Sequence, residues 1–187
     1  VTHKSDSVVT ENIYSAYELT DYLIQKGHKD IGFVGTVGGT TSITDRYLGF
    51  MRGILETGRA PNQEWVIPDR NEDGAAIELM LPERLPTAFV CNCDETAFRL
   101  VKTLKAKGIR VPEDISVTGY DNSLMSAGSL CLTTIAHPQE KLGEMAAELL
   151  LEKIREVPEE KSQIPRLIQP ELIPGNSVKD RRKQEEK

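Results

Sequence analysis

The stretch Ile115-Ser116-Val117-Thr118-Gly119-Tyr120-Asp121-Asn122 is a β-rich run that stops at a glycine and is followed at once by an acid and an amide. The turn sequence 111–114 leads directly into it. In an open α/β sheet, ligands bind beyond the carboxyl ends of the strands. A carboxylate at such an end accepts hydrogen bonds from hydroxyl or N–H groups. We therefore interpret this stretch as a strand that delivers Asp121 to the ligand edge of a sheet.

Helix and strand patterns alternate along the rest of the chain. Short apolar runs typical of buried strands occupy 31–36, 64–67, 87–91 and 132–137. Apolar stripes at helical spacing predict helices over 12–26, 44–57, 74–81, 94–107 and beyond Pro138. Strict alternation with short connections is typical of an α/β fold, a doubly wound parallel sheet with helices on both faces. Because it is rich in proline, 167–173 is predicted as an edge strand.

Composition narrows the class of protein. The chain has 187 residues, of which 28% are charged and 39% apolar, an ordinary balance for one domain with a real core. A net charge of −6 argues against a surface that grips nucleic acid. The sequence has neither a membrane-length apolar run nor a signal-peptide pattern at residues 1–10, so we expect a cytoplasmic protein with no membrane partner.

The motifs of common enzymes and metal sites are missing from the sequence. It contains no phosphate-binding glycine loop, no nucleophile elbow and no Cys/His spacing of a zinc site. His3, His28 and His137 are scattered, and we interpret them as surface or turn residues. We therefore expect no catalytic residue, no metal and no cofactor. A small enzyme on the same fold is the least favoured class, since no nucleophile–base pair is visible.

Polar side chains follow four of the predicted strands, and these define a candidate binding rim. Hydroxyls, carboxylates, an amide and guanidiniums at one edge suit the recognition of a polyol, and the fork of an arginine suits paired hydroxyls, carboxylate or phosphate. The candidates are Ser42, Arg46, Arg70, Cys93, Asp94, Asp121 and Asn122. Each has a plainer interpretation: Asp94 as a helix N-cap, Arg46 and Arg70 as solvated charges, and Asp121–Asn122 as a turn.

A series of short motifs in fixed order resembles the LacI (lactose-repressor) family of bacterial transcription regulators, in its effector-binding region. The matches lie within about residues 11–155 and are Glu11-Asn12, 22–35, 45–50, 86–88, 94–97, 108–117, 119–122 and 132–135. The resemblance implies a periplasmic-binding-protein-like pair of α/β subdomains that close on a small effector, usually a sugar or a nucleobase. Pocket positions of the family fall on Ser42, Arg46, Cys93 and Asp121.

The resemblance also implies a domain organisation. Residues 11–178 correspond to the C-terminal subdomain of the effector-binding domain, with 132–157 normally crossing into an N-terminal subdomain that is mostly missing. We expect 1–10 to be a linker and 179–187 a disordered, charged tail. The family's helix-turn-helix and hinge helix are absent from the sequence. We therefore expect a fragment, with operator DNA bound only through the absent N-terminal part.

Two further expectations concern the effector and a partner chain. The family often has an aromatic residue where this chain has Arg70, and a second guanidinium near Arg46 predicts an anionic effector such as a sugar phosphate or sugar acid. The resemblance to the family also implies a homodimer, formed through the helix beginning at Asp94 and the segment 124–130. The apolar residues implied at that interface are Phe98, Leu100, Leu124 and Met125.

These expectations combine into one interpretation. The chain is the ligand-sensing and dimerisation portion of a regulator in which a small effector allosterically controls DNA binding. The main alternative is a periplasmic-type sugar-binding protein of a transporter.

Overall fold

The computed structural model describes residues 6–123, 130–155 and 165–182. Four parallel strands form its central sheet in the order β3–β2–β4–β5. Their bounds are Val66–Ile67 for β3, Ile31–Val34 for β2, Ala88–Cys91 for β4 and Ser116–Thr118 for β5. A short 3-10 helix, η1 (Gln63–Trp65), leads into β3. The parallel sheet predicted from the short apolar runs is confirmed.

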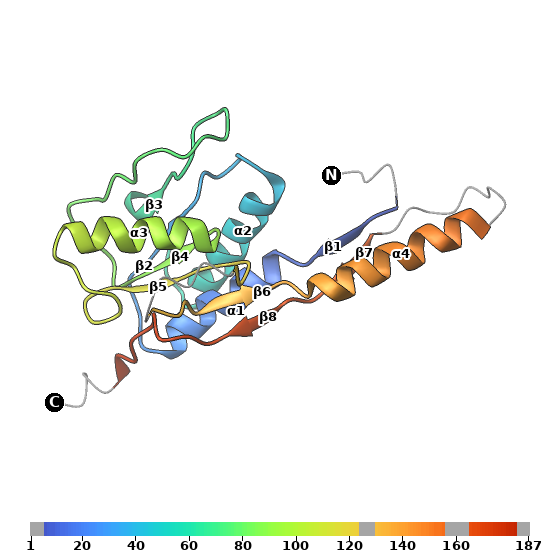
Figure 1. Cartoon of the computed structure of the whole chain (residues 1–187). Helices are drawn as coiled ribbons and strands as arrows, with labels where there is room; N and C mark the ends of the chain where they lie inside the picture. Colours follow the sequence, from blue (N-terminus) through green and yellow to red (C-terminus); the bar gives the residue numbers. More distant parts are fainter. Residues whose placement is uncertain (1–5, 124–129, 156–164, 183–187) are drawn as a thin grey trace.

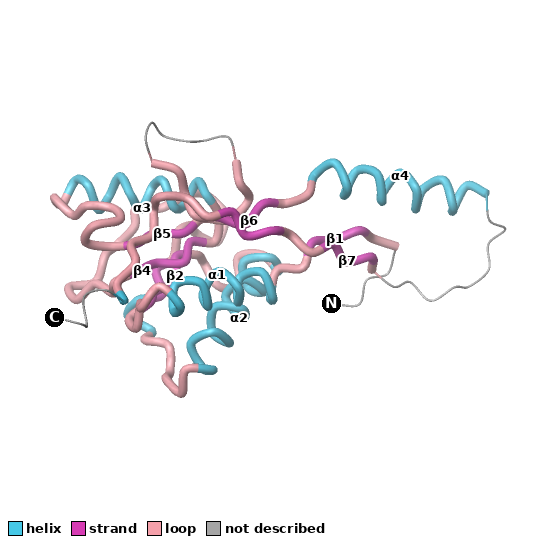
Figure 2. Tube along the Cα trace, turned by 90° about the horizontal axis from the view of Figure 1, so that it is seen from below, coloured by secondary structure: helices cyan, strands magenta, loops and turns pink. Residues whose placement is uncertain are grey.

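Alternate side chains of the strands enter two separate cores, one on each face of the sheet. Phe33 and Val90 pack with residues of α1 (Ile13–Gln25) and α2 (Thr41–Glu56). Val34 and Phe89 pack with residues of α3 (Asp94–Ala106). Figure 2 shows the sheet between α3 on one side and the α1–α2 pair on the other. Helices on both faces explain why every residue of β2 and β4 is buried.

The remaining strands extend and flank this sheet. Isolated parallel bridges from Thr118 to Thr133 and from Asp121 to Ala136 bring β6 (Thr134–Ala136) alongside the end of β5. β6 in turn pairs antiparallel with β8 (Glu171–Ile173). A separate parallel pair joins β1 (Val8–Thr10) to β7 (Arg166–Ile168). Figure 1 shows this pair and α4 (Gln139–Arg155) projecting to one side of the sheet.

Three of the predicted elements differ from the structure. In the predicted strand 64–67, residues 64 and 65 belong to the 3-10 helix η1 and only 66 and 67 form β3. The predicted helix 74–81 is a loop, because Asn71 closes a turn by accepting from the backbone N–H groups of Gly74 and Ala75. Gly74 has a φ of 81°, which is left-handed and breaks a helix. The predicted edge strand 167–173 is two strands, β7 and β8, separated at Pro170, which has no N–H to donate.

Both chain-end predictions also differ from the structure. Residues 8–10, predicted as part of a linker, form β1. Within the predicted disordered tail, residues 179–182 pack against the start of the sheet: Lys179 N donates to Ser116 Oγ at 2.9 Å and Arg181 N to Lys26 O at 2.8 Å. Backbone pairing of this kind leaves no signature in composition. Residues 183–187 lie outside the described ranges.

The docked segment also covers His28, which we predicted to be a surface or turn residue. The ring is buried, with Nδ1 2.9 Å from Thr87 Oγ1 and Nε2 3.1 Å from the carbonyl oxygen of Lys179. Burial lowers the pKa of His28 to about 4, although its hydrogen bond to the Lys179 carbonyl works in the opposite direction. His28 is therefore a neutral structural residue.

α1 and α2 pack tightly at Gly49, and this packing generates a prediction for stability. A Cβ at this position would lie 2.1 Å from the carbonyl oxygen of Ile13 and 2.9 Å from the backbone nitrogen of Tyr17. Because both atoms belong to the backbone, α1 and α2 have to separate. We expect Gly49→Ala to lower the free energy of unfolding by at least about 2 kcal/mol, measured by urea denaturation.

Gly143 of α4 is the matched control, since a Cβ there meets no atom within 4 Å. We expect Gly143→Ala to leave stability unchanged or raise it by up to about 1 kcal/mol, the difference in helix propensity. Equal effects of the two substitutions would contradict the close packing of α1 on α2.

Candidate functional site

Arg46 is a cation built into the carboxyl edge of the sheet. It lies in the second turn of α2, which begins at Thr40 with a side-chain cap to Ile43 N. Its Nε donates to Asn12 Oδ1 at 3.0 Å and its Nη1 to the carbonyl oxygen of Asn92 at 2.6 Å. The guanidinium carbon lies 3.7 Å from the centre of the Tyr120 ring, a cation–π contact. Only 12% of the side chain is exposed, so Arg46 is not a solvated surface charge.

Asn12 reaches Arg46 because another residue caps α1. Glu11, directly before it, accepts from the backbone N–H groups of Ile13, Tyr14 and Ser15 through its carboxylate. The side chain of Asn12, the residue at the N-cap position, makes no cap hydrogen bond. It is therefore available to hold the Arg46 guanidinium.

Asp121 lies beside Arg46, as the strand-end argument predicted. Its Oδ1 is 3.5 Å from Arg46 Nη1, and 39% of its side chain is exposed. Its backbone N–H donates to Ile135 O at 2.8 Å, which ties it to β6. Asp121 has a φ of 107°, a conformation that costs a non-glycine residue about 1–3 kcal/mol. Such strain persists only where the surrounding structure holds the backbone in place. The interpretation of Asp121 as part of a simple turn is therefore insufficient.

His137 also belongs to this cluster, contrary to its interpretation as a surface or turn residue. Its Nε2 is 3.1 Å from Asp121 Oδ1, and its ring centre is 5.2 Å from that of Tyr120. The sequence did contain a signal for it. His137 directly follows a strand run ended by Pro138, and the end of a parallel strand beside β5 lies at the same edge as Asp121.

Arg70 is paired with the buried carboxylate of Asp69 rather than free at the rim. Its Nε donates to Asp69 Oδ1 at 3.1 Å and its Nη2 to Oδ2 at 2.8 Å. Asp69 has 0% exposure and also accepts from the Thr36 backbone and from the side chains of Asn92 and Thr96. Arg70 therefore does not supply an unpaired positive charge of the kind that the expectation of an anionic effector requires.

The charge state of Asp69 follows from these contacts. Burial by itself raises the pKa of the carboxyl, but the hydrogen bonds from Arg70, Asn92 and Thr96 and from the Thr36 backbone outweigh it. Together they hold the pKa of Asp69 below its usual range. At neutral pH Asp69 is therefore an anion that compensates Arg70.

Asp94 has a structural role that differs from both of its predicted ones. Its Oδ1 accepts from Thr134 Oγ1 at 2.7 Å and its Oδ2 from Ser123 N at 2.7 Å. The N-cap of α3 is Cys93, and Asp94 is the first helical residue. A Cβ at Gly119 would lie 2.0 Å from Asp94 Oδ1, so the carboxylate fits only because that residue is glycine. Burial raises the pKa of Asp94, although its hydrogen bonds from Thr134 and Ser123 work against this.

The three remaining candidates lie around the edge without joining the Arg46–Asp121 pair. Ser42 Oγ is 3.1 Å from Thr40 Oγ1, and Cys93 Sγ is 3.3 Å from Thr96 Oγ1. Asn122 is exposed, with a φ of 50°, and with Asp94 it lines a small pocket of about 190 Å³. Of the seven predicted residues, the structure thus joins Arg46 to Asp121 and places Asp94 beside Asn122.

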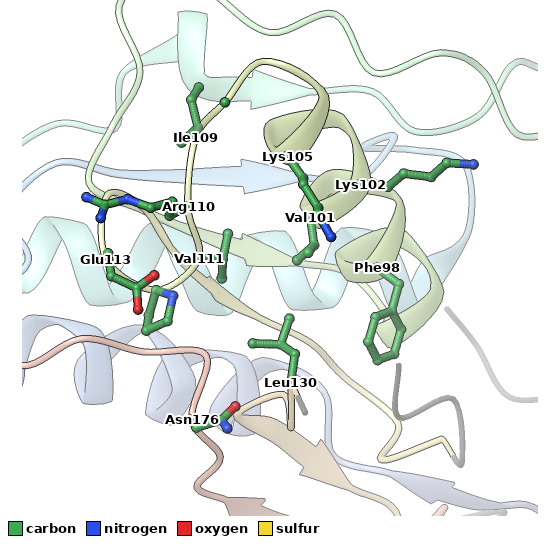
Figure 3. Close-up of a pocket in the computed structure, with 12 residues that line it drawn as sticks. Phe98, Val101, Lys102, Lys105, Ile109, Arg110, Val111, Glu113, Leu130 and Asn176 are labelled. Carbon is green, nitrogen blue, oxygen red and sulfur yellow. The ribbon is translucent and has the colours of Figure 1, made fainter. Parts of the chain in front are cut away.

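The α3 groove, of about 1030 Å³, lies between α3, the segment 108–113, Leu130 and Asn176. Apolar side chains of Phe98, Val101 and Leu130 face it, and cationic side chains such as Lys102 and Lys105 stand at its rim (Figure 3). Phe98 was predicted at a dimer interface. Leu100, predicted with it, is fully buried in the core beneath α3 and cannot face a partner. Leu124 and Met125 lie outside the described residues.

The described residues also bear on metal binding and on membrane-spanning helices. Within 6–123, 130–155 and 165–182, no three His, Cys, Asp or Glu residues gather in a way that suits a metal ion. Over the same ranges, no helix has the length and apolar character needed to span a membrane.

Comparison with known proteins identifies the class. A model of the periplasmic binding protein-like domain matches residues 20–178. The chain is 38% identical over 182 residues to the HTH-type transcriptional repressor PurR of Pasteurella multocida and 34% identical over 186 residues to that of Glaesserella parasuis. Each match covers 95% of this chain, and the chain spans about half the length of these relatives, 54% and 55% respectively.

Solved structures agree with the sequence relatives. A transcriptional regulator LacI from Bacillus cereus subsp. cytotoxis superimposes with a TM-score of 0.80 at 27% identity, covering 95% of this chain and 64% of that one. A LacI family transcriptional regulator from Enterococcus faecium with bound ribose gives 0.76 at 27% identity, covering 96% and 68%. The chain belongs to the family of periplasmic binding protein-like domains. Its relatives and structural neighbours are LacI-type regulators, and it corresponds to part of their effector-binding domain, which confirms the resemblance seen in its motifs.

The Asp69 network predicts an acid-dependent contribution to stability. The folded-state pKa of Asp69 lies below its unfolded value of about 3.9. Its contribution is therefore fully present above about pH 4 and is lost as the pH falls towards the folded pKa. We expect Asp69→Asn to lower the free energy of unfolding by about 3 kcal/mol at pH 7. The difference from wild type should shrink as the pH falls from 4 to 2.5, measured by urea denaturation.

Asp94→Asn supplies the contrast, because the folded-state pKa of Asp94 is raised. Wild type takes up a proton at this site more readily when folded, so its stability relative to Asp94→Asn should rise as the pH falls from neutral towards the unfolded-state pKa of about 3.9. Parallel pH profiles for the two variants would show that these carboxyls are not perturbed in opposite directions.

Proposed function

We propose that this chain is the effector-sensing portion of a transcription regulator and that a small molecule binds at the Arg46–Asp121 pair. The observation that carries the proposal is the position of that pair. A buried guanidinium and a partly exposed carboxylate meet at the carboxyl edge of the sheet, where ligands of doubly wound folds bind. The strained backbone of Asp121 supports it further, because strain of this kind gathers at functional sites.

The charge balance of the rim favours a neutral effector. Arg70 is compensated by Asp69, and Arg46 lies 3.5 Å from Asp121, so neither guanidinium is without an opposite charge. An anionic group at the rim would have to approach the Asp121 carboxylate without a free cation to offset the repulsion. We therefore propose a neutral, hydroxyl-rich effector such as a sugar, in place of the anionic one expected from the sequence. The ribose in the Enterococcus faecium relative is consistent with this class.

Control of DNA binding would follow from domain closure in the whole protein. The named curated relatives are HTH-type transcriptional repressors, which favours this role over a transporter binding protein or an enzyme. Two connecting segments contact this rim: Asn12, between β1 and α1, accepts from Arg46, and His137, between β6 and α4, binds Asp121. An effector held there would bias the relation of the two subdomains and so of a DNA-binding part in the cytoplasm.

Calorimetry with D-ribose and D-ribose 5-phosphate tests the effector site. We expect the neutral sugar to bind more tightly than its phosphate. Arg46→Gln and Asp121→Asn should each weaken ribose binding by about tenfold or more, the cost of a hydrogen bond to a charged group. Arg52→Gln on the same helix is the control, since Arg52 pairs with Glu56 on the exposed surface. A tighter phosphate, or equal losses in the control, would refute the proposal.

We also propose that the α3 groove contacts a second copy of this chain. Phe98, Val101 and Leu130 are apolar, only partly buried and exposed on one face. Burial of such a surface against a partner is favourable because it removes apolar area from water. The core residue Leu100 has no part in this contact.

Sedimentation velocity tests the proposed dimer. We expect the wild-type chain to dimerise at high concentration. Phe98→Glu should raise the dissociation constant of the dimer by at least about tenfold, because a charge would be buried at the contact. Leu48→Glu is the control, since Leu48 is an exposed apolar residue of α2 on the other side of the sheet. A monomeric wild-type chain at high concentration would count against the proposal.

A further inference from the structure

His137 stands between the proposed effector site and the helix that leads out of the sheet. It comes directly after β6 and two residues before the first residue of α4. Its carbonyl oxygen accepts from Gln139 N at 2.8 Å, so its backbone is part of the start of that helix. Its side chain turns to the rim, with Nε2 3.1 Å from Asp121 Oδ1 and 15% exposure.

The hydrogen bond fixes the roles of the two groups. A carboxylate only accepts, so the proton of the shared bond belongs to His137 Nε2. In the neutral ring, Nδ1 is then an acceptor, and this atom is buried with no hydrogen-bond partner among the described residues. The ring packs at 57° against Tyr120, which also contacts the Arg46 guanidinium. His137 therefore acts on the site through one hydrogen bond, which its Nε2–H donates to Asp121 Oδ1.

The same bond determines which oxygen of Asp121 is left for a ligand. Oδ1 is held by His137 at 3.1 Å and lies 3.5 Å from Arg46 Nη1, which is longer than a normal hydrogen bond. The backbone of Asp121 is already fixed to β6 through Ile135. With both the backbone and Oδ1 tethered to one strand, the carboxylate is prevented from turning fully onto Arg46 to form a two-pronged ion pair.

We propose that His137 is a positioning residue that holds Asp121 away from a closed pair with Arg46, presents Asp121 Oδ2 as the acceptor for a hydroxyl of the effector, and links that carboxylate to the start of α4. The part that concerns the effector rests on the function proposed above. The part that concerns Asp121 and α4 is a property of the chain without ligand. Loss of the Nε2 donor lets Asp121 collapse onto Arg46, which closes the rim and loosens the first turn of α4.

Two variants separate the donor from the packing of the ring. His137→Gln keeps an N–H donor at about the reach of Nε2 and removes the ring. His137→Phe keeps the ring against Tyr120 and removes the donor. We would follow amide hydrogen exchange at Asp121 and Gln139 in the ligand-free chain, with the buried strand residue Phe89 as the internal reference.

We expect exchange at Asp121 and Gln139 to be about tenfold faster in His137→Phe than in wild type, and to stay within about threefold of wild type in His137→Gln. Phe89 should be unchanged in both. The proposal would be overturned if exchange at Asp121 and Gln139 stayed slow in His137→Phe and became fast in His137→Gln. That result would mean that the ring serves only for packing. Equal exchange in all three chains would overturn it as well.

Calorimetry with D-ribose on the same variants tests the link to the effector. We expect His137→Phe to weaken ribose binding about tenfold and His137→Gln to stay within about threefold of wild type. If wild type itself does not bind ribose, the proposed effector class fails, and the exchange measurements still decide the role of His137. If ribose binds all three chains equally, His137 does not position Asp121 for the effector.

Discussion

One buried carboxylate joins most of the carboxyl edge of the sheet. Asp69 follows β3 and receives hydrogen bonds from the backbone that follows β2, from Asn92 after β4, and from Thr96 in the first turn of α3. Its own carbonyl oxygen accepts from Arg99, further along α3. Because a buried anion without partners is very costly, each of these segments is held in the position that satisfies it. The loops that carry the candidate site are therefore fixed by a charge rather than by apolar packing.

Arg46 depends on this edge in turn. The carbonyl oxygen that receives its Nη1 belongs to Asn92, whose side chain is bound to Asp69. A displacement of Asp69 would therefore shift Arg46 as well, because Asn92 binds both residues. The same edge also sets the electrostatics of the site, since Asp69 and Asp121 are each paired with an arginine and Asp94 accepts from several donors. A rim of this kind discriminates by the geometry of donors and acceptors more than by charge.

Much of the fold is predictable from the sequence because burial on both faces leaves a local signature. The runs 31–36 and 87–91 are apolar without alternation, and both became central strands. The site was predictable where one residue determined the position, as for Asp121 at the end of β5. It was not predictable where the role of a residue depended on its partner. Arg70 has the sequence context of a free cation, but in the structure it is paired with Asp69. Asn12 has the position of a helix cap, but Glu11 accepts the cap hydrogen bonds instead. His137 and the segment 179–182 depend on contacts with residues distant in the sequence, which a local pattern does not contain.

The pairing of β1 with β7 has a consequence for the order in which this part of the protein folds. Val8 is opposite Arg166, so β1 is synthesised long before the strand with which it pairs here. The strands of the central sheet, in contrast, are all synthesised by Thr118. The central sheet can therefore form before the β1–β7 pair, and until β7 is made β1 lacks the partner strand that it has in this structure.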